Sequence, residues 1–232
     1  MPDRPQLILL PGQLCDEALW APQLIGLADI ADMSVADLTL DDNIEAMADR
    51  VLAMASPIFA LIALSLGGYV ALEIATRVPD RVSRLALMNT SARSDTEDQS
   101  NRRERSVRAA RVGAFKGVTP RFLPTILDPE SAANAEIAQV VLAMTERVGR
   151  RAFERQQAAA MGRPDFRPLL GRISCPTLVI GGRQDRVTPP ALQEEIVAGI
   201  AGARLEVLDK CGHLAPLEQP QAVNRLLREL LV

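Results

Sequence analysis

The sequence predicts an α/β protein with a doubly wound, mainly parallel sheet of about six strands and one helical insertion. Three observations carry this prediction. Short runs of β-branched and aliphatic residues alternate with longer segments of helical period, which is typical of a parallel sheet covered on both faces. Several of these runs are apolar at every position, as strands buried on both faces are. The alternation is interrupted once, from about residue 90 to residue 172.

The individual elements follow from this periodicity. The expected strands are Leu7–Leu10, Met33–Asp37, Ile58–Leu64, Val82–Met88, Thr177–Ile180 and Leu205–Leu208. The expected core helices are Glu17–Leu27, Asn43–Met54, Gly68–Arg77, Pro190–Ile200 and Pro216–Leu231. Because an unstructured loop as long as 90–172 would be unusual in a compact domain, we expect residues 1–89 and 173–232 to form an α/β core and residues 90–172 a helical lid.

Local signals divide the insertion into helices. Ser94 with Glu97 three residues later is a candidate capping box at the start of the first helix. Asp128-Pro129 places a capping residue before a proline at the first helical position. Gly149 and Gly162 are expected to end helices.

Length and composition favour a single domain and exclude several classes of protein. The chain has 232 residues, which suits one core. Its longest charge-free stretch, Val51–Leu72, is broken by Pro57 and by Gly67-Gly68, so it does not predict a membrane span. The N-terminus lacks the pattern of a signal peptide, and we expect a cytoplasmic protein with a small-molecule substrate and no membrane partner. The net charge of −3 gives no reason to expect nucleic acid.

The cysteines and the single histidine argue against structural disulfides and zinc. Cys15, Cys175 and Cys211 are odd in number and far apart. Cys211-Gly212-His213 resembles half of a metal site, but the chain lacks the second pair of ligands that zinc requires. We therefore expect no metal.

Ser65 lies where the apolar run Ile58–Leu64 gives way to a helical pattern. A serine on such a strand-to-helix corner occupies the place of a nucleophile elbow. The turn is sharp, so the residues two before and two after the serine must be small, and Ala63 and Gly67 meet this requirement. Ala63 departs from the usual glycine. The alternative interpretation is an ordinary turn in which Ser65 caps the helix.

A serine nucleophile requires a base, and the base requires an acid that fixes its tautomer. His213, the single histidine, follows the strand Leu205–Leu208. Asp185 follows the strand Thr177–Ile180, so the chain order is Ser, Asp, His. Sites in open α/β sheets form at the carboxyl ends of strands, which predicts that the three residues converge.

Asp209, Glu218 and Asp95 are alternatives for the acid. Each is more simply a solvated carboxylate, and Asp209 is very close to His213 along one loop. Asp95 stays possible because it comes after the strand Val82–Met88.

Two backbone amides are expected to form an oxyanion hole. One is that of Leu66, the residue after the nucleophile, and the other is that of Gln13, in the loop after the first strand. Gly12 lets this loop approach the substrate closely.

With these motifs the chain resembles the α/β-hydrolase superfamily, and within it the small lidded serine esterases such as the pimeloyl-ester carboxylesterases. Leu9-Leu10-Pro11-Gly12 with Trp20 is similar to the family's first-strand loop, although proline stands where the family has histidine. Further matches are Pro79-Asp80-Arg81-Val82, Cys175-Pro176-Thr177, Gly212-His213 and Glu218-Gln219-Pro220. The resemblance implies a reduced or absent N-terminal hairpin, no metal and no organic cofactor.

The expected function is hydrolysis of a small carboxylic ester through an acyl-enzyme intermediate on Ser65. The same residues could serve thioester, amide or carbon–carbon bond hydrolysis, because fold does not imply substrate. A receptor-like homologue that binds a ligand without turnover is the alternative from another class. Serine rather than aspartate at position 65 argues against dehalogenase and epoxide-hydrolase mechanisms.

Arginines are concentrated in the first helix of the insertion. Arg105, Arg108 and Arg111 recur at helical spacing and could share one face. A solvated surface is one interpretation. The other is that these side chains reach the pocket and bind a substrate carboxylate, for which guanidinium groups are well suited.

Overall fold

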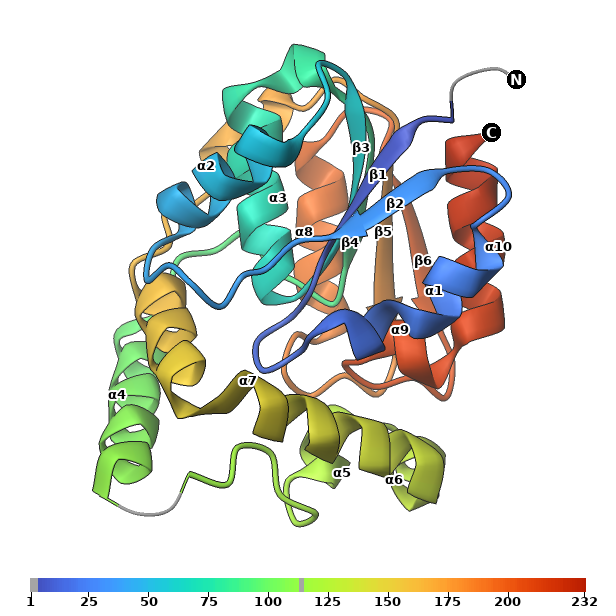
Figure 1. Cartoon of the computed structure of the whole chain (residues 1–232). Coiled ribbons are helices and arrows are strands. Elements are labelled where there is room, and N and C mark those ends of the chain that lie inside the picture. Colours follow the sequence, from blue (N-terminus) through green and yellow to red (C-terminus); the bar gives the residue numbers. More distant parts are fainter. Residues whose placement is uncertain (1–3, 113–114) are drawn as a thin grey trace.

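The computed structural model describes residues 4–112 and 115–232 and contains one six-stranded sheet in which every pair of neighbouring strands is parallel (Figure 1). The strand order is β2-β1-β3-β4-β5-β6. The strands are β1 (Gln6–Leu10), β2 (Asp32–Val35), β3 (Phe59–Leu64), β4 (Val82–Met88), β5 (Thr177–Gly182) and β6 (Arg204–Leu208). The predicted α/β class and doubly wound parallel sheet are confirmed.

Each central strand is buried on both faces and divides its side chains between two cores. In β1, Ile8 and Leu10 pack into one core, whereas Leu7 and Leu9 pack into the other. This alternation is the period-two geometry of a strand, so a wholly apolar run is required here. The strand β3, whose residues are all buried, behaves in the same way.

Helices cover both faces of the sheet (Figure 1). One face carries α2 (Ile44–Met54), α3 (Leu66–Arg77) and α8 (Pro190–Gly199). The other carries α1 (Ala21–Gly26), α9 (Ala215–Glu218) and α10 (Pro220–Leu231). Short 3₁₀ helices occupy Glu17–Trp20, Pro79–Arg81 and Arg167–Arg172. The predicted helix Pro216–Leu231 is therefore divided in two, because Gln219, with φ −132° and ψ 54°, is not helical and precedes Pro220.

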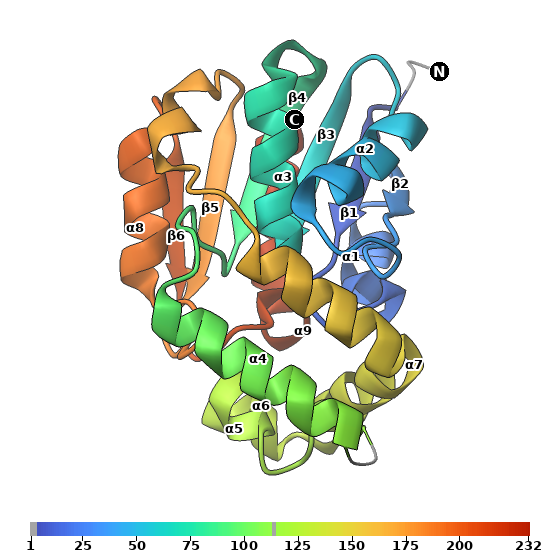
Figure 2. The ribbon, with the colours of Figure 1, turned by 90° about the vertical axis from the view of Figure 1, so that its left-hand side faces the viewer.

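Among its described residues, the segment 90–172 contains helices and no strand, and all of these helices except the 3₁₀ helix Arg167–Arg172 lie beyond the carboxyl ends of the strands (Figures 1 and 2). We call residues 90–172 the helical segment. Its helices are α4 (Glu97–Val112), α5 (Leu123–Ile126), α6 (Pro129–Ala133) and α7 (Ala135–Met161). Gly162 follows the last residue of α7, as predicted, whereas Gly149, whose φ is 73°, forms a kink inside this helix.

The start of α4 differs from the prediction. The capping box is formed by Thr96 and Gln99, not by Ser94 and Glu97: the Gln99 backbone amide donates to Thr96 Oγ1 at 3.2 Å, and the Thr96 amide donates to Gln99 Oε1 at 2.8 Å. Both pairs have the same spacing and fit the same rule, so sequence alone could not separate them. The prediction for Asp128 is confirmed, since its carboxylate accepts from the Glu130 amide at 2.9 Å.

Neither a membrane span nor a metal cluster is found in the part of the chain that the structure describes. No helix there is long and apolar enough to cross a bilayer. The same residues contain no group of three or more His, Cys, Asp or Glu side chains arranged to hold a metal ion.

Candidate functional site

Ser65 occupies the corner between β3 and α3 in a backbone conformation that non-glycine residues rarely adopt. Its φ is 52° and its ψ is −110°. A Cβ atom on Gly67 would lie 2.2 Å from the carbonyl oxygen of Leu10, so a larger residue at position 67 would require the first strand to move. Such strain persists only where the surroundings enforce it, and here the buried β3 and α3 do so.

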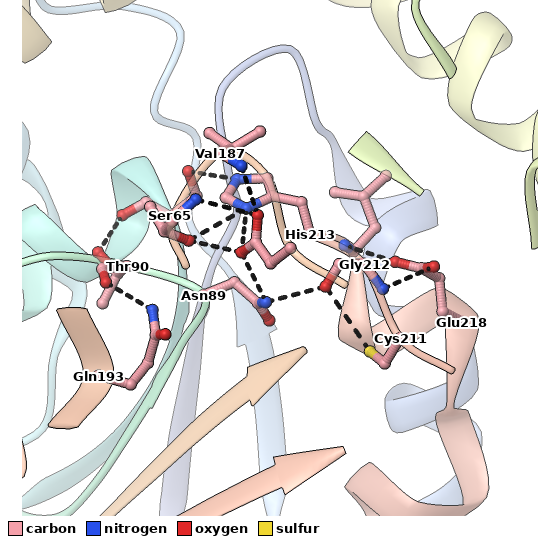
Figure 3. A network of polar contacts seen from close by, with 12 residues as sticks. Ser65, Asn89, Thr90, Val187, Gln193, Cys211, Gly212, His213 and Glu218 are labelled. Carbon is pink, nitrogen blue, oxygen red and sulfur yellow. Dashed lines mark hydrogen bonds and ion pairs between the residues drawn. The ribbon is translucent and has the colours of Figure 1, made fainter. Parts of the chain in front are cut away.

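A chain of hydrogen bonds links the serine to a histidine and an aspartate (Figure 3). Ser65 Oγ lies 2.9 Å from His213 Nε2, and His213 Nδ1 lies 2.8 Å from Asp185 Oδ2. The three side chains come from the ends of β3, β6 and β5, as the sequence predicted. In this geometry His213 can take the proton of the Ser65 hydroxyl while Asp185 holds the other ring nitrogen.

Asp185 is buried and strongly hydrogen-bonded. Its Oδ1 accepts from the backbone amides of Val187 at 2.8 Å and Thr188 at 3.0 Å. Its Oδ2 accepts from Thr188 Oγ1 at 2.6 Å and from Asn89 Nδ2 at 2.9 Å. Burial raises the pKa of Asp185, but the opposing charge of His213 and the hydrogen bonds from His213 and Thr188 outweigh it and lower the pKa to about 2. The carboxyl is therefore ionised at neutral pH.

The loop that carries His213 is held by a second buried carboxylate, Glu218, which is 8% exposed (Figure 3). Glu218 Oε2 accepts from the amides of Gly212 at 3.0 Å and Asp128 at 2.7 Å, and Oε1 accepts from the Leu214 amide at 2.9 Å. Burial raises the pKa of Glu218 above its usual value, although the amide hydrogen bonds oppose the shift. Glu218 thus connects the histidine loop to the helical segment.

The three alternative acids are engaged elsewhere. Asp95 pairs with Arg103 and Arg163. Asp209 pairs with Arg183 at the surface. Glu218 accepts hydrogen bonds from the backbone amides of Asp128, Gly212 and Leu214 and from the side chain of Ser131.

The two residues predicted for the oxyanion hole, Gln13 and Leu66, both line the cavity beside Ser65. The loop after β1 and the elbow are tied together, since the Gly67 amide donates to the Pro11 carbonyl at 3.1 Å. Within residues 4–112 and 115–232, the backbone amides of Gln13 and Leu66 donate to no other protein group. Both amides are thus available to an oxygen atom of a bound molecule.

A cavity of about 670 Å³ opens above Ser65 and His213, between the strand ends and the helical segment. Its apolar lining comes from both parts of the chain and includes Leu14, Leu66, Tyr69, Phe153 and Leu192. A volume of this size accommodates a small organic molecule.

The structure does not bring Arg105, Arg108 and Arg111 to this cavity. All three are exposed; Arg108 lies 3.9 Å from Glu104, and Arg111 pairs with Glu154 at 3.1 Å. The face of α4 that lines the cavity has a different register and consists of Gln99, Arg103, Ser106, Ala109 and Ala110. Periodicity predicts which residues share a helix face, but it does not predict which face turns inward.

Sequence reasoning missed three supporting residues: Thr188, Asn89 and Glu218. Thr188 and Asn89 hold the acid, and Glu218 holds the histidine loop. Asn89 directly follows β4, and Glu218 follows His213 by five residues. Their closeness to the predicted site along the chain could have indicated a supporting role. Nothing in the sequence distinguishes Thr188 from other loop threonines.

The two cysteines near the site are poor nucleophiles. Burial, together with the charge of Asp16, raises the pKa of the Cys15 thiol to about 12. Burial, with the nearby carboxylate of Glu218, also raises the pKa of the Cys211 thiol. Both remain protonated near neutral pH, whereas the thiolate is the reactive form.

Known proteins share this architecture. A family model described as "Alpha/beta hydrolase family" matches residues 6–226. The chain is 30% identical over 193 residues to the pimeloyl-(acyl-carrier protein) methyl ester esterase of Neisseria meningitidis serogroup C, covering 82% of this chain and 75% of that protein. It is 29% identical over 174 residues to 3-oxoadipate enol-lactonase 2 of Acinetobacter baylyi, covering 72% and 61% respectively. The structure of a thermophilic esterase from Thermogutta terrifontis, malate bound, has a TM-score of 0.89 at 27% identity, covering 99% of this chain and 90% of that one.

Proposed function

The chain belongs to the alpha/beta hydrolase family and is a hydrolase, and from this premise we propose that it is a serine esterase that cleaves small carboxylic esters through an acyl-enzyme. The observation that carries the proposal is the continuous hydrogen-bonded chain from Ser65 through His213 to the ionised Asp185. A hydroxyl is a weak nucleophile by itself, and this chain supplies the base and the group that orients it.

The reaction proceeds in two halves. Ser65 Oγ attacks the ester carbonyl while its proton passes to His213 Nε2, and the amides of Gln13 and Leu66 stabilise the oxyanion. His213 then protonates the departing alcohol, which leaves the acyl group on Ser65. A water molecule, deprotonated by His213, attacks the acyl-enzyme, and the proton returns to Ser65 as the acid departs.

Ester chemistry is favoured among the possible bonds by the names of the relatives. The N. meningitidis and T. terrifontis proteins are esterases, and the A. baylyi protein is an enol-lactonase. The helical segment acts as a lid in this proposal, since it closes the cavity over Ser65 and excludes water from one side.

The test compares turnover of nitrophenyl esters and thioesters of graded chain length by wild type and by Ser65→Ala. We expect wild type to prefer the oxygen esters and Ser65→Ala to lose nearly all turnover. Near-normal activity in folded Ser65→Ala would overturn the mechanism. A higher kcat/KM for thioesters would correct the bond class, and turnover of only a few events per hour on every substrate would favour a binding protein.

A further inference from the structure

The cavity wall contains positively charged side chains but no carboxylate among the described residues. Among the described residues that line it, four are arginine or lysine and none is aspartate or glutamate. The four are Arg93, Arg103, Lys116 and Arg163. A cationic side chain beside a poorly solvated space is costly unless a carboxylate or a bound anion neutralises it, so the partners of each cation matter.

The four cations differ in how well they are neutralised. Arg93 forms a two-pronged ion pair with Glu195, at 2.9 and 3.0 Å. Arg103 and Arg163 share one carboxylate, that of Asp95, whose side chain is 1% exposed. Two guanidinium groups thus face one carboxylate, which leaves one positive charge in excess.

Arg103 is the member of this cluster that can reach a ligand. Its side chain is 22% exposed, whereas that of Arg163 is 2% exposed. Arg163 is further held by the carbonyl of Arg93 at 2.8 Å and by the ring of Tyr69, 4.4 Å from its guanidinium carbon. Arg163 therefore serves as a fixed support, and Arg103 presents the excess charge.

Two glutamine side chains on the same wall, Gln99 and Gln157, also provide hydrogen-bond donors. Arg103 Nη1 donates to Gln157 Oε1 at 2.9 Å, and because a guanidinium has no acceptor, the oxygen of Gln157 must face it. The Thr96 amide donates to Gln99 Oε1 at 2.8 Å, which fixes that side chain in the same way. Among the described residues, the NH₂ groups of Gln157 and Gln99 donate to no protein group, and both residues line the cavity.

We infer that this wall binds a carboxylate of the substrate, remote from the scissile bond. The inference rests on the proposed function and narrows the substrate to an ester with one free carboxylate, such as the half-ester of a dicarboxylic acid. A carboxylate has two acceptor oxygens and no donor, so it complements a wall made of Arg103, Gln99, Gln157 and Lys116. Lys116 is exposed, lines the cavity and makes no ion pair with any described residue.

The cationic cluster and the nucleophile line the same cavity. Tyr69, which stacks on Arg163, belongs to the first turn of α3 and lies four residues after Ser65. Ser65, His213 and Arg103 line a single cavity of about 670 Å³. A half-ester can therefore place its carboxylate on the wall while its ester carbonyl lies at Ser65.

The experiment measures kcat/KM for the mono-4-nitrophenyl ester of hexanedioic acid and for 4-nitrophenyl hexanoate, which has equal chain length and no charge. We expect wild type to prefer the anionic ester by about tenfold or more, since a charge-assisted hydrogen bond in a partly desolvated site contributes at least that factor. Arg103→Gln should remove most of the preference and Lys116→Gln part of it. The preference should shrink as salt is raised.

The matched control is Arg102→Gln, on the same helix, exposed and outside the cavity lining. It changes the net charge equally, and we expect it to alter the preference by less than about twofold, because distant surface charges are screened. Equal effects of Arg102→Gln and Arg103→Gln would overturn the inference. So would equal kcat/KM of wild type for the two esters, an outcome that leaves the serine esterase mechanism standing.

A binding measurement separates the two proposals and allows for instability of Arg103→Gln, whose partner Asp95 is buried. Calorimetry compares monomethyl hexanedioate with methyl hexanoate on folded Ser65→Ala and on Ser65→Ala with Lys116→Gln. Tighter binding of the anionic compound by about tenfold, weakened by Lys116→Gln, supports the carboxylate site even if no ester is cleaved. Equal affinity for both compounds refutes the site even if esters are cleaved.

Discussion

Asp185 receives hydrogen bonds from Asn89, Val187 and Thr188 in addition to His213. The opposing charge of His213 and the hydrogen bonds from His213 and Thr188 explain why a carboxylate in a buried position remains ionised. It also fixes the direction from which the carboxylate meets the imidazole ring. At the scale of single residues, the site therefore depends on an acid whose charge and position are both held by its neighbours.

Asp185→Asn tests the role of that charge. An amide keeps the shape of the side chain but cannot accept in the same way, so His213 should adopt the wrong tautomer and kcat should fall by about 10⁴. Steady-state kinetics on purified protein check this, with Asp209→Asn, which alters an exposed carboxylate at the surface, as the control. A mild effect of Asp185→Asn would rule out Asp185 as the acid.

The low pKa of Asp185 also predicts how stability depends on pH. The folded carboxyl binds a proton near pH 2 and the unfolded one near 3.8, so between these values the unfolded state binds more protons. The carboxylate should therefore stabilise the fold above about pH 4, and this contribution should be lost as pH falls toward 2. This contribution to the free energy of unfolding is on the order of 2 kcal/mol.

Denaturant unfolding of wild type and Asp185→Asn from pH 7 to pH 3 measures this contribution. The gap in the free energy of unfolding should be constant above about pH 5 and should narrow below about pH 4. A gap that stays constant down to pH 3 would mean that the carboxyl is not stabilised in its ionised form.

At the scale of elements, sharp turns at strand ends bring the site together. The wholly apolar strands could be predicted from the sequence because period and composition agree, and the bounds of β4 match the prediction. The capping box of α4 could not, since two pairs of residues with the same spacing fit the rule, and its inward face could not, since that face depends on how the helix packs against α7. The elbow was predictable because a sharp strand-to-helix turn requires a small residue at Gly67, where a Cβ atom would meet the carbonyl oxygen of Leu10.

Glu218→Gln tests whether the histidine loop is positioned by the buried carboxylate. All the backbone partners of Glu218 are donors, and a glutamine NH₂ group would face at least one of them. We expect a loss of about 1–3 kcal/mol in the free energy of unfolding. Because His213 would also shift, kcat should fall by about tenfold to a hundredfold.

The control for Glu218→Gln is Glu229→Gln, on α10, whose carboxylate pairs with Arg204 at the surface. Glu229→Gln should change neither the free energy of unfolding nor kcat measurably. If Glu218→Gln lowered stability but left kcat and its pH profile unchanged, the residue would have a structural role alone.

At the scale of the whole molecule, the site lies at the junction of the sheet and the helical segment. The sheet supplies Ser65, Asp185 and His213, and the helical segment supplies much of the cavity wall. These three residues at the strand ends could be predicted from the sequence, because their order along the chain and the topology of the sheet are enough to bring them together. The identity of the wall residues could not, because Arg103, and not Arg105, faces inward only once the helices are packed.

The most direct test of the account is intact-protein and peptide mass spectrometry after rapid acid quenching of wild type with a 4-nitrophenyl ester. The account predicts that the protein gains the mass of the acyl group, that the modified peptide carries it on Ser65, and that Ser65→Ala shows no such gain. An acyl group found on Cys15 or Cys211, or ester turnover by Ser65→Ala at the wild-type rate, would contradict it.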